Sequence, residues 1–104
     1  MSILEIIKKS AENKILFLPH AVNQMSRLDR MITPSEVRKV ISCGEIIENY
    51  PKDIRGHSCL MLGFGDNKRP IHVVCAPKNE FLAIITAYIP SGNEWKEDFK
   101  ERKK

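Results

Sequence analysis

Long hydrophobic runs are the first thing that this sequence lacks. No stretch approaches the roughly 18 apolar residues that a membrane-spanning helix needs. The chain begins with a carboxylate at Glu5 and has its first lysines after the apolar residues, which is the reverse of a signal peptide. The sequence therefore predicts a protein that stays in the cytoplasm and has no membrane partner.

Cysteine and the common catalytic motifs are also scarce. The three cysteines, Cys43, Cys59 and Cys75, form no Cys-x-x-Cys pair, which argues against a disulfide framework and against zinc. We expect small buried thiols in a reducing compartment. Gly63-Phe-Gly65 is too short for a phosphate loop, and neither paired nor clustered carboxylates are evident. The sequence therefore predicts no metal site and no cofactor.

What the sequence does have is a globular composition with a basic excess. The chain has 104 residues, of which 42% are hydrophobic and 29% charged, and this predicts a single domain over residues 1–104. The net charge of +4 favours an anionic partner such as RNA, DNA or an acidic protein. The basic residues gather in 27–39 and 96–104, and the second group is also typical of a solvated terminus.

Apolar patterning predicts helices first and strands afterwards. The expected helices follow capping boxes at Ser2–Glu5 and Thr33–Glu36, occupy residues 20–28, and end the chain after Ser91. The expected strands are 15–18, 45–50, 58–64, 69–77 and 81–90. Val22, Met25 and Leu28 are expected to face inward, as are Trp95 and Phe99 of the last helix. The fold class is therefore α+β, with N-terminal helices on one face of a mainly antiparallel four- to five-stranded sheet and a short C-terminal helix.

The last two apolar runs each carry one side chain that can transfer a proton, His72 and Tyr88. Alternation along these runs assigns the fully apolar sets to the helices, namely Ile71, Val73 and Cys75 with Phe81, Ala83, Ile85, Ala87 and Ile89. The other face then holds His72, Val74 and Ala76 with Leu82, Ile84, Thr86 and Tyr88. We expect His72 to lie opposite or diagonal to Thr86 and within reach of Tyr88, unless the register slips by one residue.

A face with imidazole, phenol and hydroxyl groups beside Lys68 and Arg69 suits metal-free cleavage of RNA. That reaction needs a base, an acid and cations that stabilise charge on the phosphorus oxygens. Histidine serves either proton role near neutral pH, and arginine matches phosphate with a bidentate fork. The alternative is that His72 and Tyr88 are hydrogen-bonded core residues with a structural role only.

His20 is a second candidate, because it lies at a strand-to-helix junction where anionic ligands are favoured. Arg27 and Arg30 can bring two guanidinium groups to the same ligand. The alternative is that His20 only caps the start of its helix. His57 lies in an expected turn, where we expect it to be solvated.

Several strings of the sequence are similar to those of a group of small, uncharacterised bacterial and archaeal proteins. They are Leu18–Met25, Ile32–Arg38, Gly44–Pro51, Arg69–Val74 and Ile85–Pro90. This group resembles the RelE/ParE toxin superfamily, whose members are often paired with a small zinc-finger antitoxin of the YgiT/MqsA type. The resemblance covers nearly all of residues 18–95. One departure is Gln24, where the family typically has an arginine four residues after the first histidine.

The resemblance implies a metal-independent endoribonuclease that cleaves mRNA, free or on the ribosome, and is silenced by an antitoxin partner. The implied catalytic residues are His20, His72 and Tyr88, and the expected phosphate-binding residues are Arg27, Arg30, Lys68, Arg69 and Thr86. Two other functions stay open at this point. One is a non-catalytic module that binds nucleic acid or protein, and the other is a ParE-like toxin directed at gyrase.

Overall fold

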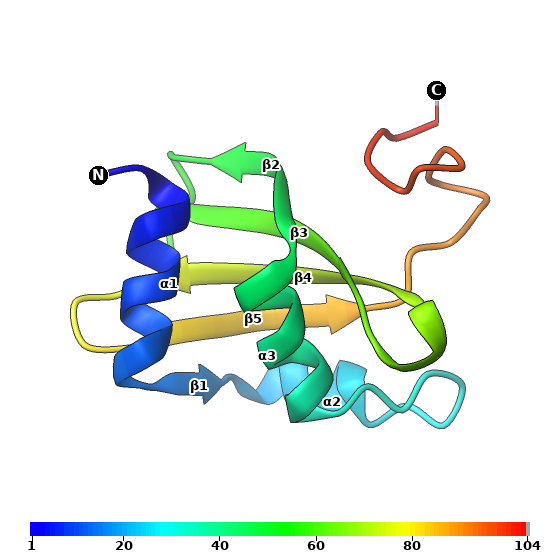
Figure 1. Cartoon of the computed structure of the whole chain (residues 1–104), viewed down its shortest axis with the longest axis horizontal. Helices are drawn as coiled ribbons and strands as arrows, with labels where there is room; N and C mark the ends of the chain where they lie inside the picture. The colour runs from blue at the N-terminus through cyan, green and yellow to red at the C-terminus, as the bar shows by residue number, and fades with distance from the viewer. Residues whose placement is uncertain (104) are drawn as a thin grey trace.

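Three α-helices, five strands and one 3-10 turn form the part of the chain that the computed structural model describes, residues 1–103 (Figure 1). In chain order they are α1 (Ile3–Asn13), β1 (Ile15–Phe17), α2 (Pro19–Met25), α3 (Pro34–Cys43), β2 (Glu45–Tyr50), β3 (Ser58–Phe64), η1 (Asp66–Lys68), β4 (Pro70–Pro77) and β5 (Leu82–Tyr88). None of these helices is long and apolar enough to cross a membrane.

The two predicted capping boxes begin α1 and α3. The hydroxyl of Ser2 accepts the amide of Glu5 at 3.2 Å, and the hydroxyl of Thr33 accepts the amide of Glu36 at 3.1 Å. Each glutamate accepts in return from the amide of the capping residue. These pairs satisfy amides that would otherwise lack a hydrogen bond at a helix start. The short local signal was therefore sufficient to place the starts of both helices.

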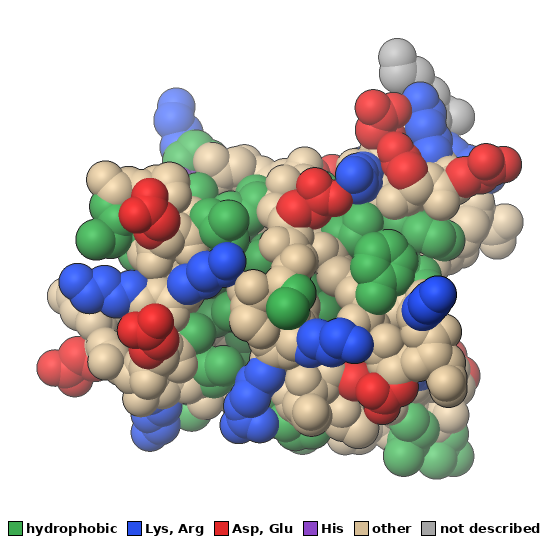
Figure 2. Space-filling model, viewed as in Figure 1, with side chains coloured by type: hydrophobic (Ala, Val, Ile, Leu, Met, Phe, Trp, Pro, Cys, Tyr) green, Lys and Arg blue, Asp and Glu red, His purple; other side chains and the backbone are tan. Residues whose placement is uncertain are grey.

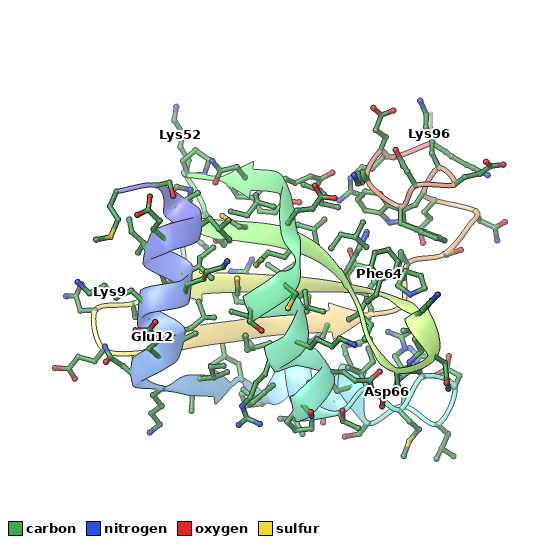
Figure 3. All side chains as sticks on the ribbon, in the orientation of Figure 1. Lys9, Glu12, Lys52, Phe64, Asp66 and Lys96 are labelled. Atoms are coloured by element: carbon green, nitrogen blue, oxygen red, sulfur yellow. The ribbon has the colours of Figure 1, made fainter. Side chains whose placement is uncertain are left out.

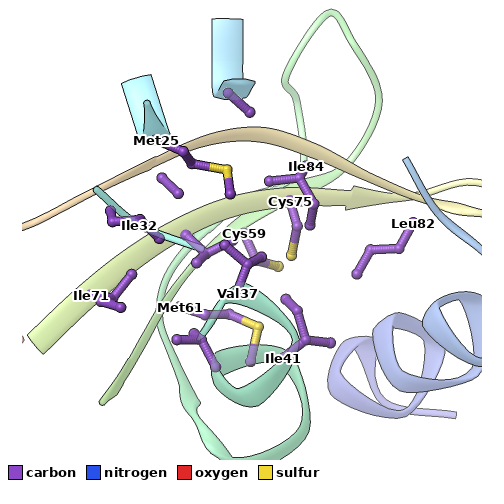
Figure 4. Packing of buried hydrophobic residues seen from close by; sticks show 14 of the residues in the cluster. Met25, Ile32, Val37, Ile41, Cys59, Met61, Ile71, Cys75, Leu82 and Ile84 are labelled. Atoms are coloured by element: carbon purple, nitrogen blue, oxygen red, sulfur yellow. The ribbon is translucent and has the colours of Figure 1, made fainter. Parts of the chain in front are cut away.

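The strands form one mixed sheet in the order β1-β5-β4-β3-β2. β1 runs parallel to β5, while the other neighbours are antiparallel, so the predicted mainly antiparallel sheet is confirmed. α1 and α3 lie on one face of this sheet, as predicted (Figure 1). The core fills the space between them with Val37, Ile41, Met61, Val73 and Ile84 among its members (Figure 4).

The predicted inward face of the second helix is confirmed at Met25 and wrong at Val22 and Leu28. α2 ends at Met25, and Leu28 lies in the following turn with 92% of its surface exposed. Val22 is also exposed, whereas Ala21 and Met25 are buried. Met31 has φ 46°, and its amide donates a hydrogen bond to the carbonyl of Arg27, which closes the turn. This tight turn ends the helix earlier than the apolar spacing predicted.

A bulge in β5 changes which of its side chains face the helices. Val74 pairs with Thr86, but the next residue, Cys75, pairs with Ile84, so that Ile85 is the extra residue. Leu82 and Ile84 therefore join the core on the helical side, opposite to their predicted face. Ala87 and Tyr88, the last two residues of β5, keep their predicted faces because they lie beyond the bulge.

The predicted C-terminal helix is absent from the described residues 91–103, which form turns instead. Trp95 bridges Arg102 in an antiparallel sense, the amide of Lys96 donates to the carbonyl of Glu101 at 2.8 Å, and Phe99 has φ 59°. The segment, which carries the labelled Lys96, lies near the start of β2 (Figure 3). Because Trp95 is buried against the sheet, tertiary packing has overridden the local helix signal.

Candidate functional site

His72 and Tyr88 face each other across β4 and β5. They are Cα partners in the register, and the hydroxyl of Tyr88 is 3.2 Å from Nδ1 of His72. Thr86 lies diagonally on the same face, opposite Val74. The predicted grouping of these three side chains is therefore confirmed, and the bulge at Ile85 does not disturb it.

His72 is fully buried rather than open to solvent. Its Nε2 lies 2.8 Å from the carbonyl oxygen of Phe99, and its ring meets Trp95 edge-on with centroids 4.4 Å apart. Because a carbonyl only accepts, Nε2 carries the hydrogen, and Nδ1 of the neutral ring accepts from the Tyr88 hydroxyl. Burial lowers the pKa of His72, although the Phe99 carbonyl and the Glu48 carboxylate act in the opposite direction. The imidazole is therefore held neutral.

Tyr88 connects this buried pair to an open pocket of about 440 Å³ between α2, the end of β5 and the C-terminal segment. The pocket is lined by His20, Gln24, Arg30, Thr86, Tyr88, Ile89, Ser91, Glu94, Trp95 and Arg102. His20 and Gln24 are four residues apart and so share one side of α2, just as Thr86 and Tyr88 share one side of β5. Burial raises the pKa of the Tyr88 phenol, which therefore keeps its proton at neutral pH.

Arg30 brings a guanidinium group into this pocket beside Gln24. Its Nη1 donates to the Gln24 side-chain oxygen at 3.2 Å, and its side chain is 16% exposed. Gln24 of α2 is thus accompanied in the pocket by an arginine from the turn after α2. Arg27 does not line the pocket, because its Nε is 3.3 Å from Asp29 and its side chain is half-exposed.

Arg69 and Lys68 also lie outside the pocket. The Nη2 of Arg69 is 2.8 Å from Glu36, and the same guanidinium donates to the carbonyls of Arg30 and Met31. Glu36 is only 2% exposed, and this burial alone would raise its pKa. Hydrogen bonds from Arg69 and from backbone amides prevail and lower the pKa of Glu36 to about 2. Arg69 therefore fixes the turn that carries Arg30, while Lys68 is exposed in η1.

Arg102 is a pocket residue that the sequence did not single out, because it belongs to the basic end of the chain. Its Nε and Nη2 lie 2.9 and 3.1 Å from the carboxylate of Glu48, and its guanidinium stacks 4.6 Å above the ring of Trp95. The hydroxyl of Tyr50 donates to the same carboxylate. Ser91 and Glu94 were expected at the start of a C-terminal helix, so the sequence did not predict that they line the pocket.

Outside the candidate pocket, the described surface gathers fewer side chains that could bind or act on a ligand. Acidic and basic side chains are interspersed over the face that carries α1 and α3 (Figure 2). A second cavity of about 400 Å³ between these helices has a mainly aliphatic floor that includes Ala11, Ile15 and Ile41. His57 contacts the side chain of Asn49 and takes no part in the candidate pocket. Cys59 and Cys75 are buried as expected, whereas Cys43 is exposed.

The candidate pocket therefore combines an exposed imidazole, two guanidinium groups, a phenol and a carboxylate. Guanidinium groups bind phosphate oxygens, and imidazole and carboxylate move protons. No curated protein and no solved structure matched the chain. The model of one protein family, described as a domain of unknown function (DUF4258), matches residues 17–89. This range includes α2 and the pocket residues up to Ile89, but not those of the C-terminal segment. The chain therefore belongs to the DUF4258 family.

Proposed function

We propose that this chain is a metal-independent endoribonuclease of the RelE/ParE toxin type, and that RNA is cleaved in the pocket between α2 and the C-terminal segment. The observation that carries the proposal is the convergence of His20, Arg30, Tyr88 and Arg102 on one open pocket of about 440 Å³. A volume of this size is in the range of small-ligand sites. Cations and a proton-transfer group in one cleft are what cleavage of a phosphodiester requires.

In the proposed reaction, the 2′-hydroxyl of a ribose attacks the adjacent phosphorus and the 5′-oxygen leaves. The products are a 2′,3′-cyclic phosphate and a 5′-hydroxyl end. Arg30 and Arg102 bind the phosphate and stabilise the charge that grows on its oxygens. His20 exchanges a proton with the reacting oxygens, since an imidazole can serve as a general acid or a general base. The hydroxyl of Thr86 provides a further hydrogen bond to the phosphate.

Tyr88 and His72 have different parts in this proposal. The Tyr88 hydroxyl donates its hydrogen to Nδ1 of His72, so that its oxygen lone pairs are available toward the pocket. Tyr88 therefore offers a hydrogen-bond acceptor that orients the bound nucleotide. His72 does not reach the pocket itself and acts as a positioning residue, because it fixes the rotation of the phenol.

A non-catalytic RNA-binding module is the competing function, and the burial of His72 favours it. Such a module would use the same guanidinium groups to hold phosphates without a proton transfer. It would bind RNA with a strong dependence on salt but would leave the strand intact.

The proposal also includes a small antitoxin partner that covers the pocket and thereby blocks RNA.

Induced expression separates these functions. We expect growth arrest and new transcript ends in cells that express the wild-type chain, and neither effect in a His20→Ala/Tyr88→Phe double variant. The matched control is His57→Ala, because this histidine lies outside the pocket. Arrest with intact transcripts would point to the gyrase-directed alternative. If the double variant is as toxic as the wild type and produces the same new transcript ends, the assignment of the pocket is refuted.

A further inference from the structure

The pocket contains one feature that phosphate binding does not explain, the carboxylate of Glu94. It is an exposed side chain in a cleft that also holds the guanidinium groups of Arg30 and Arg102. Among residues 1–103, no lysine, arginine or histidine lies within 4.0 Å of it. A carboxylate would repel a phosphate, so its presence beside a phosphate site points to a different task.

The backbone of Glu94 is held on both sides. Its amide donates to the carbonyl of Ser91 at 3.1 Å, and its carbonyl accepts from the amide of Lys103 at 2.8 Å. The next residue, Trp95, is 3% exposed and packs against the ring of His72. The C-terminal segment therefore fixes the point from which the carboxylate extends, next to the sheet.

The carboxylate lines the same pocket as the Tyr88 phenol that we assign to the bound nucleotide. Burial is the main cause of the raised pKa of Tyr88, and the negative charge of Glu94 adds to it. A carboxylate that can take the proton of the 2′-hydroxyl therefore lies in the same pocket as the group that orients the nucleotide.

Resting on the proposed function, we infer that Glu94 is the general base of the reaction and His20 the general acid. The carboxylate of Glu94 takes the proton of the 2′-hydroxyl as the bond from this oxygen to phosphorus forms. The bond from phosphorus to the 5′-oxygen breaks, and this oxygen receives a proton from the imidazolium of His20. Glu94 ends protonated and His20 neutral, and exchange with water restores both.

Two substrates distinguish a base from an acid. One is an RNA oligonucleotide, and the other is the same RNA with a 5′-bridging sulfur at one position, whose leaving thiolate needs no proton. Glu94→Gln should lose about 100-fold or more of the cleavage rate on both substrates, as is typical for loss of a proton-transfer group. His20→Ala should lose rate on the ordinary RNA only and recover on the sulfur substrate.

The controls use the same segment. Glu97→Gln removes a neighbouring exposed carboxylate that does not line the pocket, and its rate should stay at that of the wild type. Glu94→Asp keeps a carboxylate and should retain part of the activity. The fluorescence of Trp95, the single tryptophan, reports whether each variant keeps the segment in place.

Three results would overturn the inference. A Glu94→Gln variant that cleaves RNA within about threefold of the wild-type rate would remove Glu94 from proton transfer. Recovery of Glu94→Gln on the sulfur substrate would make it an acid instead of a base. If the wild-type chain binds RNA without cleaving it, both the proposed function and the role of Glu94 fail together, whereas the first two results leave the function intact.

Discussion

The hydroxyl of Tyr88 and Nδ1 of His72 are 3.2 Å apart, and the two residues are direct partners in the antiparallel pairing of β4 and β5. The second ring nitrogen of His72 donates to the carbonyl of Phe99 at 2.8 Å. A histidine with both nitrogens bonded and no exposed surface is a structural group. Of these two residues, only Tyr88 lines the pocket.

The first prediction concerns the pH dependence of stability. Burial lowers the pKa of His72 from the 6.5 of a free histidine, so below that pH the unfolded chain binds a proton that the folded chain excludes. The free energy of unfolding should therefore fall as the pH drops through about 6.5, with a slope of up to about 1.4 kcal/mol per pH unit. Urea unfolding at pH 7.5 and 5.5 measures this loss.

His72→Gln should reduce that slope, because the amide does not titrate in this range. The lowered pKa values of Glu36 and Glu48 act below about 4.5, outside the window of His72. If the wild type is as stable at pH 5.5 as at pH 7.5, or if the variant keeps the same slope, then His72 is not held neutral.

The second prediction tests which arginine binds phosphate. Arg30→Ala should weaken RNA binding and lower the slope of log affinity against log salt by about 0.7, the value for one phosphate contact on a single strand. Arg27→Ala removes the same charge three residues earlier from a more exposed side chain that does not line the pocket, and should change the slope less. Equal effects of the two substitutions would show that only the overall charge matters.

The third prediction concerns the buried ion pair between Arg69 and Glu36. Arg69→Met leaves the carboxylate of Glu36 buried without its cation and frees the turn that carries Arg30. We expect a loss of about 3 kcal/mol in the free energy of unfolding, measured by urea denaturation. Arg55→Met removes a more exposed pair with Asp53 and should cost much less. Similar losses in both variants would contradict a special role for the buried pair.

The fourth prediction uses two glycines. A methyl group at Gly65 would collide with the side chain of Glu36 and lie 2.6 Å from Cδ1 of Ile71, whereas one at Gly92 would meet nothing within 4 Å. Gly65→Ala should therefore destabilise the fold by about 1–3 kcal/mol, and Gly92→Ala should be neutral within about 0.5 kcal/mol. Thermal unfolding of both variants checks this difference, and equal melting temperatures would contradict the packing around Glu36.

Much of the fold could be predicted from the sequence because its signals are local. The capping boxes at Ser2 and Thr33 need only residues three positions apart, and the shared face of His72 and Tyr88 follows from alternation along the strands. Alternation does not reveal a bulge, so Leu82 and Ile84 were assigned to the wrong face. The extra residue is visible only once the partner strand is in place.

The site was less predictable because its parts come from distant segments. Arg69 was expected to hold phosphate, yet its partner Glu36 is 33 positions away in sequence and no local pattern connects them. The end of the chain was expected to be helical, so the sequence did not predict that Glu94 and Arg102 line the pocket. Their place at the pocket depends on the burial of Trp95 against His72, a tertiary contact that outweighs local helix propensity.

Cleavage of a defined RNA by the purified chain tests the central claim most directly. The substrate is one oligonucleotide in the presence of EDTA, compared with the same strand carrying a single 2′-deoxyribose at the cleaved position. We predict that the wild-type chain produces 2′,3′-cyclic phosphate and 5′-hydroxyl ends from the first strand and leaves the second intact at that position. Salt-sensitive binding with no cleavage of either strand, or equal cleavage of both, would contradict a ribonuclease that uses the 2′-hydroxyl.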